Sequence, residues 1–202
     1  MRKLSEGAES RIYQVRVFGI DGIMKRRAKK GYRIREIDDN LRVQRTKKEA
    51  RIMSFVLSYG IRAPTPLLVD KYDILMSRVH GSNLNDLLDS KADFGKIFSV
   101  LGNYAAILHN NNIVHGDYTP ANMMVCKNGQ VYLIDFGLSE MANSINEKAL
   151  DLLLMKRSVS KAYFHKLVDS YKVKCKDSGT ILKRLERIEK MGRYNTRTLL
   201  AD

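Results

Sequence analysis

Three polar residues with a fixed spacing constrain this chain more than any other feature of its sequence. Asp117 and Asn122 lie five residues apart in the stretch HGDYTPANMMV, and Asp135 follows in LIDFG after the apolar run 131–134. Such a run is typical of a buried strand, which would bring Asp135 to the same place as the preceding loop. Either segment alone could arise by chance on a solvated loop, but the combination favours a functional site.

These residue types suit the transfer of a phosphoryl group from ATP. In that reaction oxygen ligands hold Mg²⁺ against the nucleotide phosphates, and a separate carboxylate orients the attacking hydroxyl or water. We therefore expect Asp117 to be the catalytic base, with Asn122 and Asp135 as the ligands of Mg²⁺. His115 is expected to pack behind the site rather than to act as a base, and Gly137 to free the backbone after Asp135.

A lysine and a glutamate upstream complete the expected catalytic set. The reaction needs a lysine for the α and β phosphates and a glutamate that holds this lysine. Lys25 follows a predicted hairpin, in which residues 10–18 alternate like a strand and 19–22 form the turn. Glu49, in the predicted helix 41–57, is its expected partner. Lys25 could instead be one more surface lysine, but the downstream motifs favour the functional role.

Two further segments are expected to contact the nucleotide. The strand predicted at 72–76 leads into residues 77–81, which are the predicted hinge between the halves of the chain. Backbone groups of Ser77 and Val79 would meet the adenine edge, with Met76 at the back of the pocket. The other segment is a phosphate-covering loop with a single glycine, whose backbone N–H groups would cradle phosphate oxygens. An ordinary turn would also explain that loop. Its residues are Ser5, Glu6, Gly7, Ala8, Glu9 and Ser10.

Taken together, these segments resemble the PRPK family, the small atypical kinase of the KEOPS complex, in its archaeal form. The resemblance covers nearly the whole chain and is carried by SEGAES, IMKRRAKKGYR, RTKKEARIM, HGDYTPANMM and IDFGLSE. The basic insert that ends at Arg33 and the pair Arg45-Thr46 separate this family from ordinary protein kinases. Only nine residues lie between Gly137 and the predicted helix near Glu147, so the activation segment of ordinary kinases has no room.

The resemblance implies an α+β fold, namely a reduced bilobal protein-kinase-like fold without an activation segment. The N-terminal lobe, 1–79, would hold a small antiparallel sheet and one long helix. The C-terminal lobe, 80–202, would be mainly helical with a basic tail, and ATP would lie between the lobes. Apolar periodicity supports helices at 94–111 and 162–171. Asp151 matches the aspartate with which a helix of this family bonds the backbone of the catalytic loop, but from its position alone it could equally be an exposed acid at the start of a helix.

The resemblance also implies a function in tRNA modification. It predicts a Mg-ATP-dependent serine/threonine kinase or ATPase that regulates the ASKHA-fold threonylcarbamoyl-transferase subunit of KEOPS, with another small KEOPS subunit at the N-terminal lobe. The pathway product would be threonylcarbamoyladenosine in tRNA. Some archaea fuse the kinase to the transferase, and the start of this sequence would suit the C-terminal half of such a fusion. The tail is less basic than the usual family tail, which leaves its contact with tRNA or ATP open.

A net charge of +14 predicts a polyanionic partner. Twelve basic residues but only four acids lie between Lys25 and Arg51. Such a field attracts phosphate backbones, so tRNA is the expected partner, contacted through charge and shape. A solvated surface or an acidic protein partner would explain the same charge. A second basic zone comprises Lys183, Arg184, Arg187, Lys190, Arg193 and Arg197.

The composition excludes several other classes of protein. A chain of 202 residues can bury one good core or two small packed lobes, and no stretch is long and apolar enough to span a membrane. No signal peptide is recognisable. Cys126 and Cys175 lack a paired spacing, so we expect a cytoplasmic protein without a disulfide or a zinc site.

Three alternatives compete with this interpretation. A RIO-type kinase also lacks the activation segment, but we expect it to need an N-terminal winged helix, for which there is no room before Lys25. An aminoglycoside-type phosphotransferase also uses an HGD loop, but its acidic helical insertions are missing from this basic chain. The third is a non-catalytic scaffold that binds tRNA and partners and uses ATP structurally; the filled catalytic positions argue against it.

Overall fold

The computed structural model describes residues 1–198 except Ala8, Phe18 and Lys91. The side chains of 192–198 lie outside that description, and with them the basic groups expected from Arg193 and Arg197.

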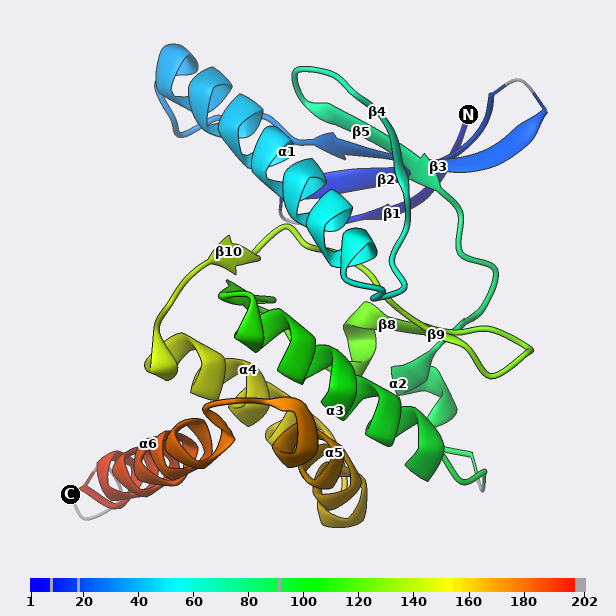
Figure 1. The fold of residues 1–202 in the computed structure, drawn as a ribbon. Helices are drawn as coiled ribbons and strands as arrows, with labels where there is room; N and C mark the ends of the chain where they lie inside the picture. The colour runs from blue at the N-terminus through cyan, green and yellow to red at the C-terminus, as the bar shows by residue number, and fades with distance from the viewer. Residues whose placement is uncertain (8, 18, 91, 199–202) are drawn as a thin grey trace. The chain divides into compact units, whose positions relative to one another are not determined.

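The chain divides into two compact units. Their segments can be followed in Figure 1, where the colour follows the residue number. The first unit comprises Met1–Gly81 and Tyr132–Leu138, and the second comprises Ser82–Val131 and the residues from Ser139 onward. The division is therefore not a single cut in the sequence. The short segment that contains Asp135 returns to the first unit, because the backbone N–H of Leu133 donates to the carbonyl of Arg62 at 2.9 Å.

The first unit is built on a five-stranded antiparallel sheet with the order β1-β2-β3-β5-β4. The turn between β2 and β3 is tighter than expected, because Ile20 is already paired with Val17 and Gly22 with Val15. Gly19 takes a positive φ of 79° at this turn, which a residue without a side chain adopts easily. The strands are β1 (Arg2–Glu6), β2 (Ser10–Val17), β3 (Ile20–Arg27), β4 (Pro66–Val69) and β5 (Asp73–Ser77).

Helix α1 (Arg35–Ser58) contacts β4 and β5 of this sheet. It begins at Arg35 rather than at 41, where apolar periodicity starts. Its first turns are held by charge instead: buried Asp38 forms ion pairs with Arg42 at 2.9 Å and with Arg33 at 3.6 Å. A pattern of apolar residues does not reveal such a start, because the residue that faces inward is an acid. The predicted inner face is confirmed at Ile52, Met53 and Val56, whereas Leu57 is half-buried.

The second unit is mainly helical. In it, α3 packs on α5 and α4 on α6, while short strand pairs form between β6 and β8 and between β7 and β10. Its elements are β6 (Ser82–Asn83), α2 (Leu84–Leu87), α3 (Gly95–Asn110), β7 (Ile113–Val114), the 3₁₀ turn η1 (Pro120–Asn122), β8 (Met123–Val125), β10 (Glu140–Met141), α4 (Ile145–Ser158), α5 (Lys161–Lys174) and α6 (Ser178–Thr198). Strand β9 (Val131–Leu133) begins in this unit and ends in the first.

The core of the second unit lies where α3 meets α5. Phe98 is fully buried and stacks on Tyr163, with 4.7 Å between the ring centroids. Val100, which periodicity placed on the inner face, is 36% exposed, because its neighbours Phe98 and Leu101 take the buried positions. Gly102 lies at the closest approach of the two helices, since a Cβ there would collide with the carbonyl oxygen of Leu167.

The last helix, α6, presents an apolar face that is narrower than periodicity suggests. Ile181 and Leu185 are buried, but Met191, which was expected in the core, is 61% exposed. In the part of the chain that the structure describes, no helix combines the length and apolar character needed to cross a bilayer.

We predict that Gly102→Ala destabilises the second unit by about 1–3 kcal/mol, because the added methyl group must push α3 away from the backbone of α5. The free energy of unfolding from urea titration measures the loss. Gly179→Ala is the matched control in α6, where nothing lies within 4 Å of the added Cβ. There the change should be neutral or stabilising by up to about 1 kcal/mol. Equal stabilities of the two variants would contradict the close approach.

Candidate active site

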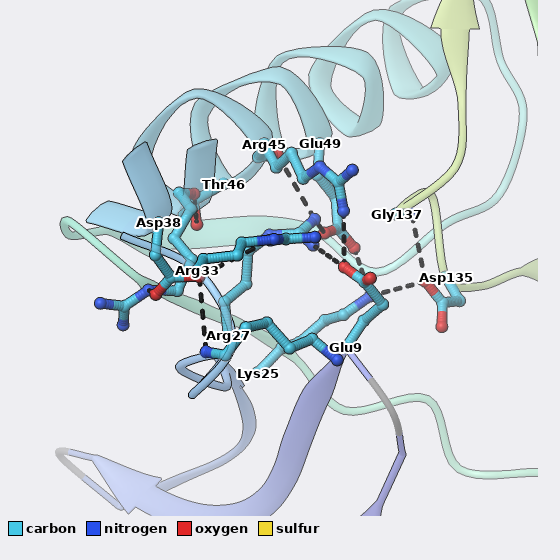
Figure 2. Close-up of polar contacts among 12 residues, drawn as sticks. Glu9, Lys25, Arg27, Arg33, Asp38, Arg45, Thr46, Glu49, Asp135 and Gly137 are labelled. Atoms are coloured by element: carbon cyan, nitrogen blue, oxygen red, sulfur yellow. Dashed lines mark hydrogen bonds and ion pairs between the residues drawn. The ribbon is translucent and has the colours of Figure 1, made fainter. Parts of the chain in front are cut away.

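Lys25 and Glu49 form a buried ion pair in the first unit. Strand β3 supplies the lysine and α1 the glutamate, and the lysine Nζ lies 2.6 Å from Glu49 Oε1 (Figure 2). Lys25 is only 5% exposed, so the alternative of a surface lysine is wrong. A lysine is buried in this way only when opposite charge compensates its lost hydration.

A second carboxylate completes the surroundings of the lysine. Asp135 Oδ1 lies 2.5 Å from Lys25 Nζ. Burial acts to lower the pKa of Lys25, but the charges of Glu49 and Asp135 outweigh it, so the pKa of this amine is raised. The amine therefore keeps its positive charge at neutral pH, as the binding of a phosphate requires.

The segment that carries Asp135 is unusual in its backbone. Asp135 has a positive φ of 58°, which a non-glycine residue adopts at a cost and which is often found at functional sites. Gly137 donates its N–H to Asp135 Oδ1 at 3.1 Å. A Cβ on Gly137 would lie 3.0 Å from this oxygen and 3.3 Å from Lys25 Nζ. Gly137 is thus needed for space beside the ion pair, and the unusual backbone belongs to Asp135 instead.

The predicted phosphate-covering loop is shorter than its six residues. Ser5 and Glu6 belong to β1, where they pair with Ile12 and Arg11, and Ser10 begins β2. The prediction was wrong for these three residues because two adjacent strands extend further than the turn residues suggested. Exposed Glu6 is held in place by Lys3 and Arg11, and these two hydrogen bonds lower the pKa of its carboxyl.

Within the remaining loop, Gly7 does not offer a cradle in this conformation. Its N–H donates to the carbonyl of Ser10 at 2.9 Å, which closes the turn. Ala8 lies outside the described residues. Glu9 fixes the far side of the loop, because its carbonyl accepts a hydrogen bond from the N–H of Ala28 at 3.0 Å.

The predicted hinge residues occupy the end of β5. Met76 is buried and paired with Ile23 on β3. Ser77 is still part of the strand, and its N–H donates to the carbonyl of Thr65 at 2.9 Å. That N–H is therefore not available to an adenine ring, and the expected contact of Ser77 stays a prediction for its carbonyl only. Val79 lies beyond the strand and is half-buried.

Asp117 and Asn122 lie side by side in the second unit. Asn122 Nδ2 donates to the Asp117 carbonyl at 2.9 Å and to its carboxylate Oδ2 at 2.7 Å. The contact follows from local structure, because the 3₁₀ turn that starts at Pro120 folds the five-residue spacing back on itself. The backbone N–H of Asn122 also donates to the carbonyl of Thr119 at 3.0 Å.

Asp151 anchors the loop that carries Asp117. Its two carboxylate oxygens accept the N–H groups of His115 at 2.7 Å and of Gly116 at 2.9 Å, and Asp151 itself is buried in α4. The expected structural role of Asp151 is thereby confirmed. His109 extends the network, with Nε2 3.5 Å from Asp151 and Nδ1 2.8 Å from the hydroxyl of Tyr171.

His115 packs behind the loop, as expected. It is fully buried, its ring meets that of Tyr118 edge-on with 5.8 Å between the centroids, and its carbonyl accepts the hydroxyl of Ser139 at 2.8 Å. A histidine in this position shapes the loop rather than exchanging protons with solvent.

The oxygen donors expected for Mg²⁺ agree with the preferences of that ion. Mg²⁺ takes one or two protein oxygen ligands and completes its shell with waters and phosphate oxygens. Among the described residues, no group of three or more His, Cys, Asp or Glu residues could hold a metal by itself. Within its own unit, Asn122 offers an amide oxygen and Asp135 a half-exposed carboxylate, both of the kind that Mg²⁺ prefers.

The basic cluster of the first unit is partly neutralised. Arg26 pairs with Asp73 at 2.8 Å and Arg45 with Glu9 at 2.7 Å. These acids lie outside the segment 25–51, so the positive field there is weaker than the charges of the segment alone suggest. Basic residues between Lys25 and Arg51 with ion pairs in the structure include Lys25, Arg26, Arg27, Arg33, Arg42 and Arg45.

Arg27 was missed as a site residue. No motif singled it out, yet it is 4% exposed and donates to Glu49 Oε2 at 2.5 Å. The signal was present in the sequence, because side chains two residues apart on a strand point to the same face. Lys25 and Arg27 on β3 therefore reach the same glutamate.

Comparison with known proteins places these features in a family. A family model described as the RIO domain matches residues 12–177. Our expectation that a RIO-type assignment needs an N-terminal winged helix is therefore wrong, because the domain itself matches. The KEOPS complex subunit Bud32 of Pyrococcus abyssi is 34% identical, and the alignment covers 98% of this chain and 98% of that protein.

Longer relatives match as well. A probable bifunctional tRNA threonylcarbamoyladenosine biosynthesis protein of Methanosphaera stadtmanae is 33% identical over 85% of this chain, and one of Methanococcus vannielii is 33% identical over 95%. The chain spans only about a third of the length of these bifunctional relatives, 33% and 36% respectively.

Solved structures support the fold. The Rio2 kinase of Chaetomium thermophilum aligns with a TM-score of 0.66 at 16% identity, covering 96% of this chain and 73% of that one. Its complex with ADP, Mg²⁺ and phosphoaspartate aligns with a TM-score of 0.64 at the same identity, covering 96% and 72%. The predicted α+β kinase-like fold is confirmed. The chain belongs to the RIO-domain family and, within it, to the group of the small atypical kinase of the KEOPS complex represented by Bud32.

Proposed function

We propose that this protein binds Mg-ATP and acts as an atypical serine/threonine kinase or ATPase within a KEOPS complex. The observation that carries the proposal is the buried Lys25, which stays charged between Glu49 and Asp135. The end-to-end similarity to a KEOPS subunit supports it. A cation buried at such a cost, in contact with a strained aspartate, is a site prepared for an anion rather than an ordinary ion pair.

In this proposal Lys25 binds phosphate oxygens and Glu49 holds the lysine in position. Asp135 Oδ1 now lies 2.5 Å from the lysine amine, and a phosphate oxygen would take over this place. The carboxylate would then be available, together with the amide of Asn122, to hold Mg²⁺. When bound, that ion would neutralise charge on the phosphates.

Asp117 would orient the hydroxyl or water that attacks. Its carboxylate is held at Oδ2 by Asn122 Nδ2, 2.7 Å away, which limits its rotation. The loop is in turn fixed at its backbone by Asp151. A carboxylate positioned in this way can accept a proton from the attacking group, and such general-base contributions are typically about 10²–10⁴-fold.

The proposed biological setting is the formation of threonylcarbamoyladenosine in tRNA. The relatives named for this pathway support it, and a cytoplasmic location agrees with such a substrate. We propose that the kinase lobes are 1–79 and 80–202, and that the partners are the ASKHA-fold transferase subunit, a further small subunit at the N-terminal lobe, and tRNA. The phosphoryl acceptor would be water, a partner or a residue of the chain itself.

We predict that the protein releases phosphate from Mg-ATP and that total tRNA with the transferase subunit stimulates the release. Asp117→Ala and Asp135→Ala should each reduce it to background, because one removes the base and the other a metal ligand. Phosphate release under multiple turnover is the measurement. Asp89→Ala is the control, since Asp89 is an exposed acid of the second unit far in sequence from both motifs.

A different result would change the assignment. If phosphate release by the wild-type protein stays at background while nucleotide and tRNA still bind, the enzyme proposal fails and a nucleotide-stabilised scaffold takes its place. Release that survives both substitutions would mean that another site hydrolyses ATP.

The tRNA contact can be tested on one face of α1. Lys47 and Arg51 are exposed and four residues apart, so they lie on the same side of the helix. We predict that Lys47→Glu with Arg51→Glu weakens tRNA binding and lowers the slope of log Kd against log salt concentration by about 2, one for each lost phosphate contact. Binding isotherms at several salt concentrations measure this slope.

The control carries the same change of charge elsewhere. Lys161→Glu with Lys166→Glu alters two exposed residues of α5. If the slope of log Kd against log salt concentration falls by as much in this control as in the α1 variant, the protein binds tRNA through its net charge and α1 has no special role.

A further inference from the structure

Arg27 shares Glu49 with Lys25. The two oxygens of this carboxylate are divided between them, with Oε1 2.6 Å from Lys25 Nζ and Oε2 2.5 Å from Arg27 Nη2 (Figure 2). All three side chains are buried. The carboxylate is therefore held from both sides and cannot turn about its axis without giving up one of its partners.

The guanidinium of Arg27 also extends to the loop between β1 and β2. Its Nη2 lies 3.4 Å from the carbonyl of Arg45 on α1, and its Nη1 lies 3.8 Å from Glu9 Oε2. The same Glu9 oxygen is 2.7 Å from Arg45 Nη1. Figure 2 shows these groups converging, with Arg27 between the glutamate of the helix and the glutamate of the loop.

This arrangement is more than an ordinary stabilising ion pair. A buried pair needs only one cation for one carboxylate, whereas Glu49 has two, and the second carboxylate near Arg27 comes from the rim. Arg27 Nε is also buried and has no hydrogen-bond partner within the described part of the chain. A buried N–H without a partner is costly and calls for an explanation beyond pairing with Glu49, which points to a role in positioning.

We propose that Arg27 is a positioning residue that couples the loop at Glu9 to the Lys25–Glu49 pair. The inference rests on the proposed binding of ATP phosphates by Lys25. When a phosphate takes the place of Asp135 beside the lysine, Lys25 loses one of its carboxylates, but Arg27 still holds Glu49 in the same place. Because Glu9 is bound to Arg27 and Arg45, the loop takes its position from the same glutamate.

This role has a kinetic signature. A lysine that binds phosphate equally in the ground state and in the transition state affects KM, whereas kcat stays nearly unchanged. Arg27 acts through this lysine, so its loss should appear in KM for Mg-ATP. A purely structural role would instead reduce the amount of folded protein, which lowers the maximal rate and leaves KM as it was.

The test uses conservative variants that keep or only neutralise the charge. Arg27→Lys keeps a cation beside Glu49 but cannot contact Glu49 and the Arg45 carbonyl with one planar group. Glu9→Gln removes the charge of a half-exposed residue and should leave folding intact. We expect each variant to raise KM for Mg-ATP about tenfold with kcat within about twofold of wild type. The double variant should raise KM by less than the product of the two single increases, because both changes act in one network.

Matched controls lie on the same strand. Arg26 is the neighbour of Arg27 but is half-exposed and pairs with Asp73 on β5. Arg26→Lys and Asp73→Asn make the same two kinds of change in an ion pair of similar length, and each should leave KM unchanged. Thermal melting of every variant checks folding.

Each outcome decides one point. If Arg27→Lys and Glu9→Gln keep the KM of the wild type, the positioning role is wrong while the proposed nucleotide site stands. If Arg27→Lys does not fold, Glu9→Gln alone decides, since an unchanged KM in that variant overturns the coupling. If the wild-type protein itself neither binds nor hydrolyses Mg-ATP, the proposed function fails, and this is visible before any variant is compared.

Discussion

The ion pair between Lys25 and Glu49 is the interaction on which the first unit depends. It links β3 to α1 at a point where both side chains are buried, so neither can lose its partner without leaving an uncompensated charge in the interior. The position of α1 against the sheet is therefore tied to the position of the lysine amine. Arg27 and Asp135 gather around the same pair, which makes it the centre of a small network rather than a single contact.

The second unit uses a different device for the same purpose. The loop that carries Asp117 is fixed through backbone N–H groups, which donate to both carboxylate oxygens of Asp151. The side chain of Asp117 is then oriented locally by Asn122. The N–H groups of His115 and Gly116 hold the loop. The side chains of Asp117 and Asn122, which would meet the substrate, are therefore not needed to anchor it.

Much of this could be predicted from the sequence, because motifs with fixed spacing report local chemistry. The pairing of Lys25 with Glu49 follows from residue types and periodicity, whereas the helix aspartate and the α+β class were implied by the family resemblance. Boundaries were less predictable: α1 starts at Arg35 because buried Asp38 is paired with arginines, and no apolar pattern signals a buried acid. The loop around Gly7 is shorter than predicted, because the pairing of β1 with β2 continues as far as Glu6 and Arg11.

The sequence by itself determined which candidate residues stand at which spacing, because covalent order sets both. Only the tertiary structure decided how those residues are used. It showed that Arg27 is buried, that the N–H of Ser77 donates to the carbonyl of Thr65, and that Arg26 and Arg45 pair with acids distant in sequence. Burial and ion pairing depend on which segments are in contact in the folded chain. The order of charges along the sequence does not specify these contacts.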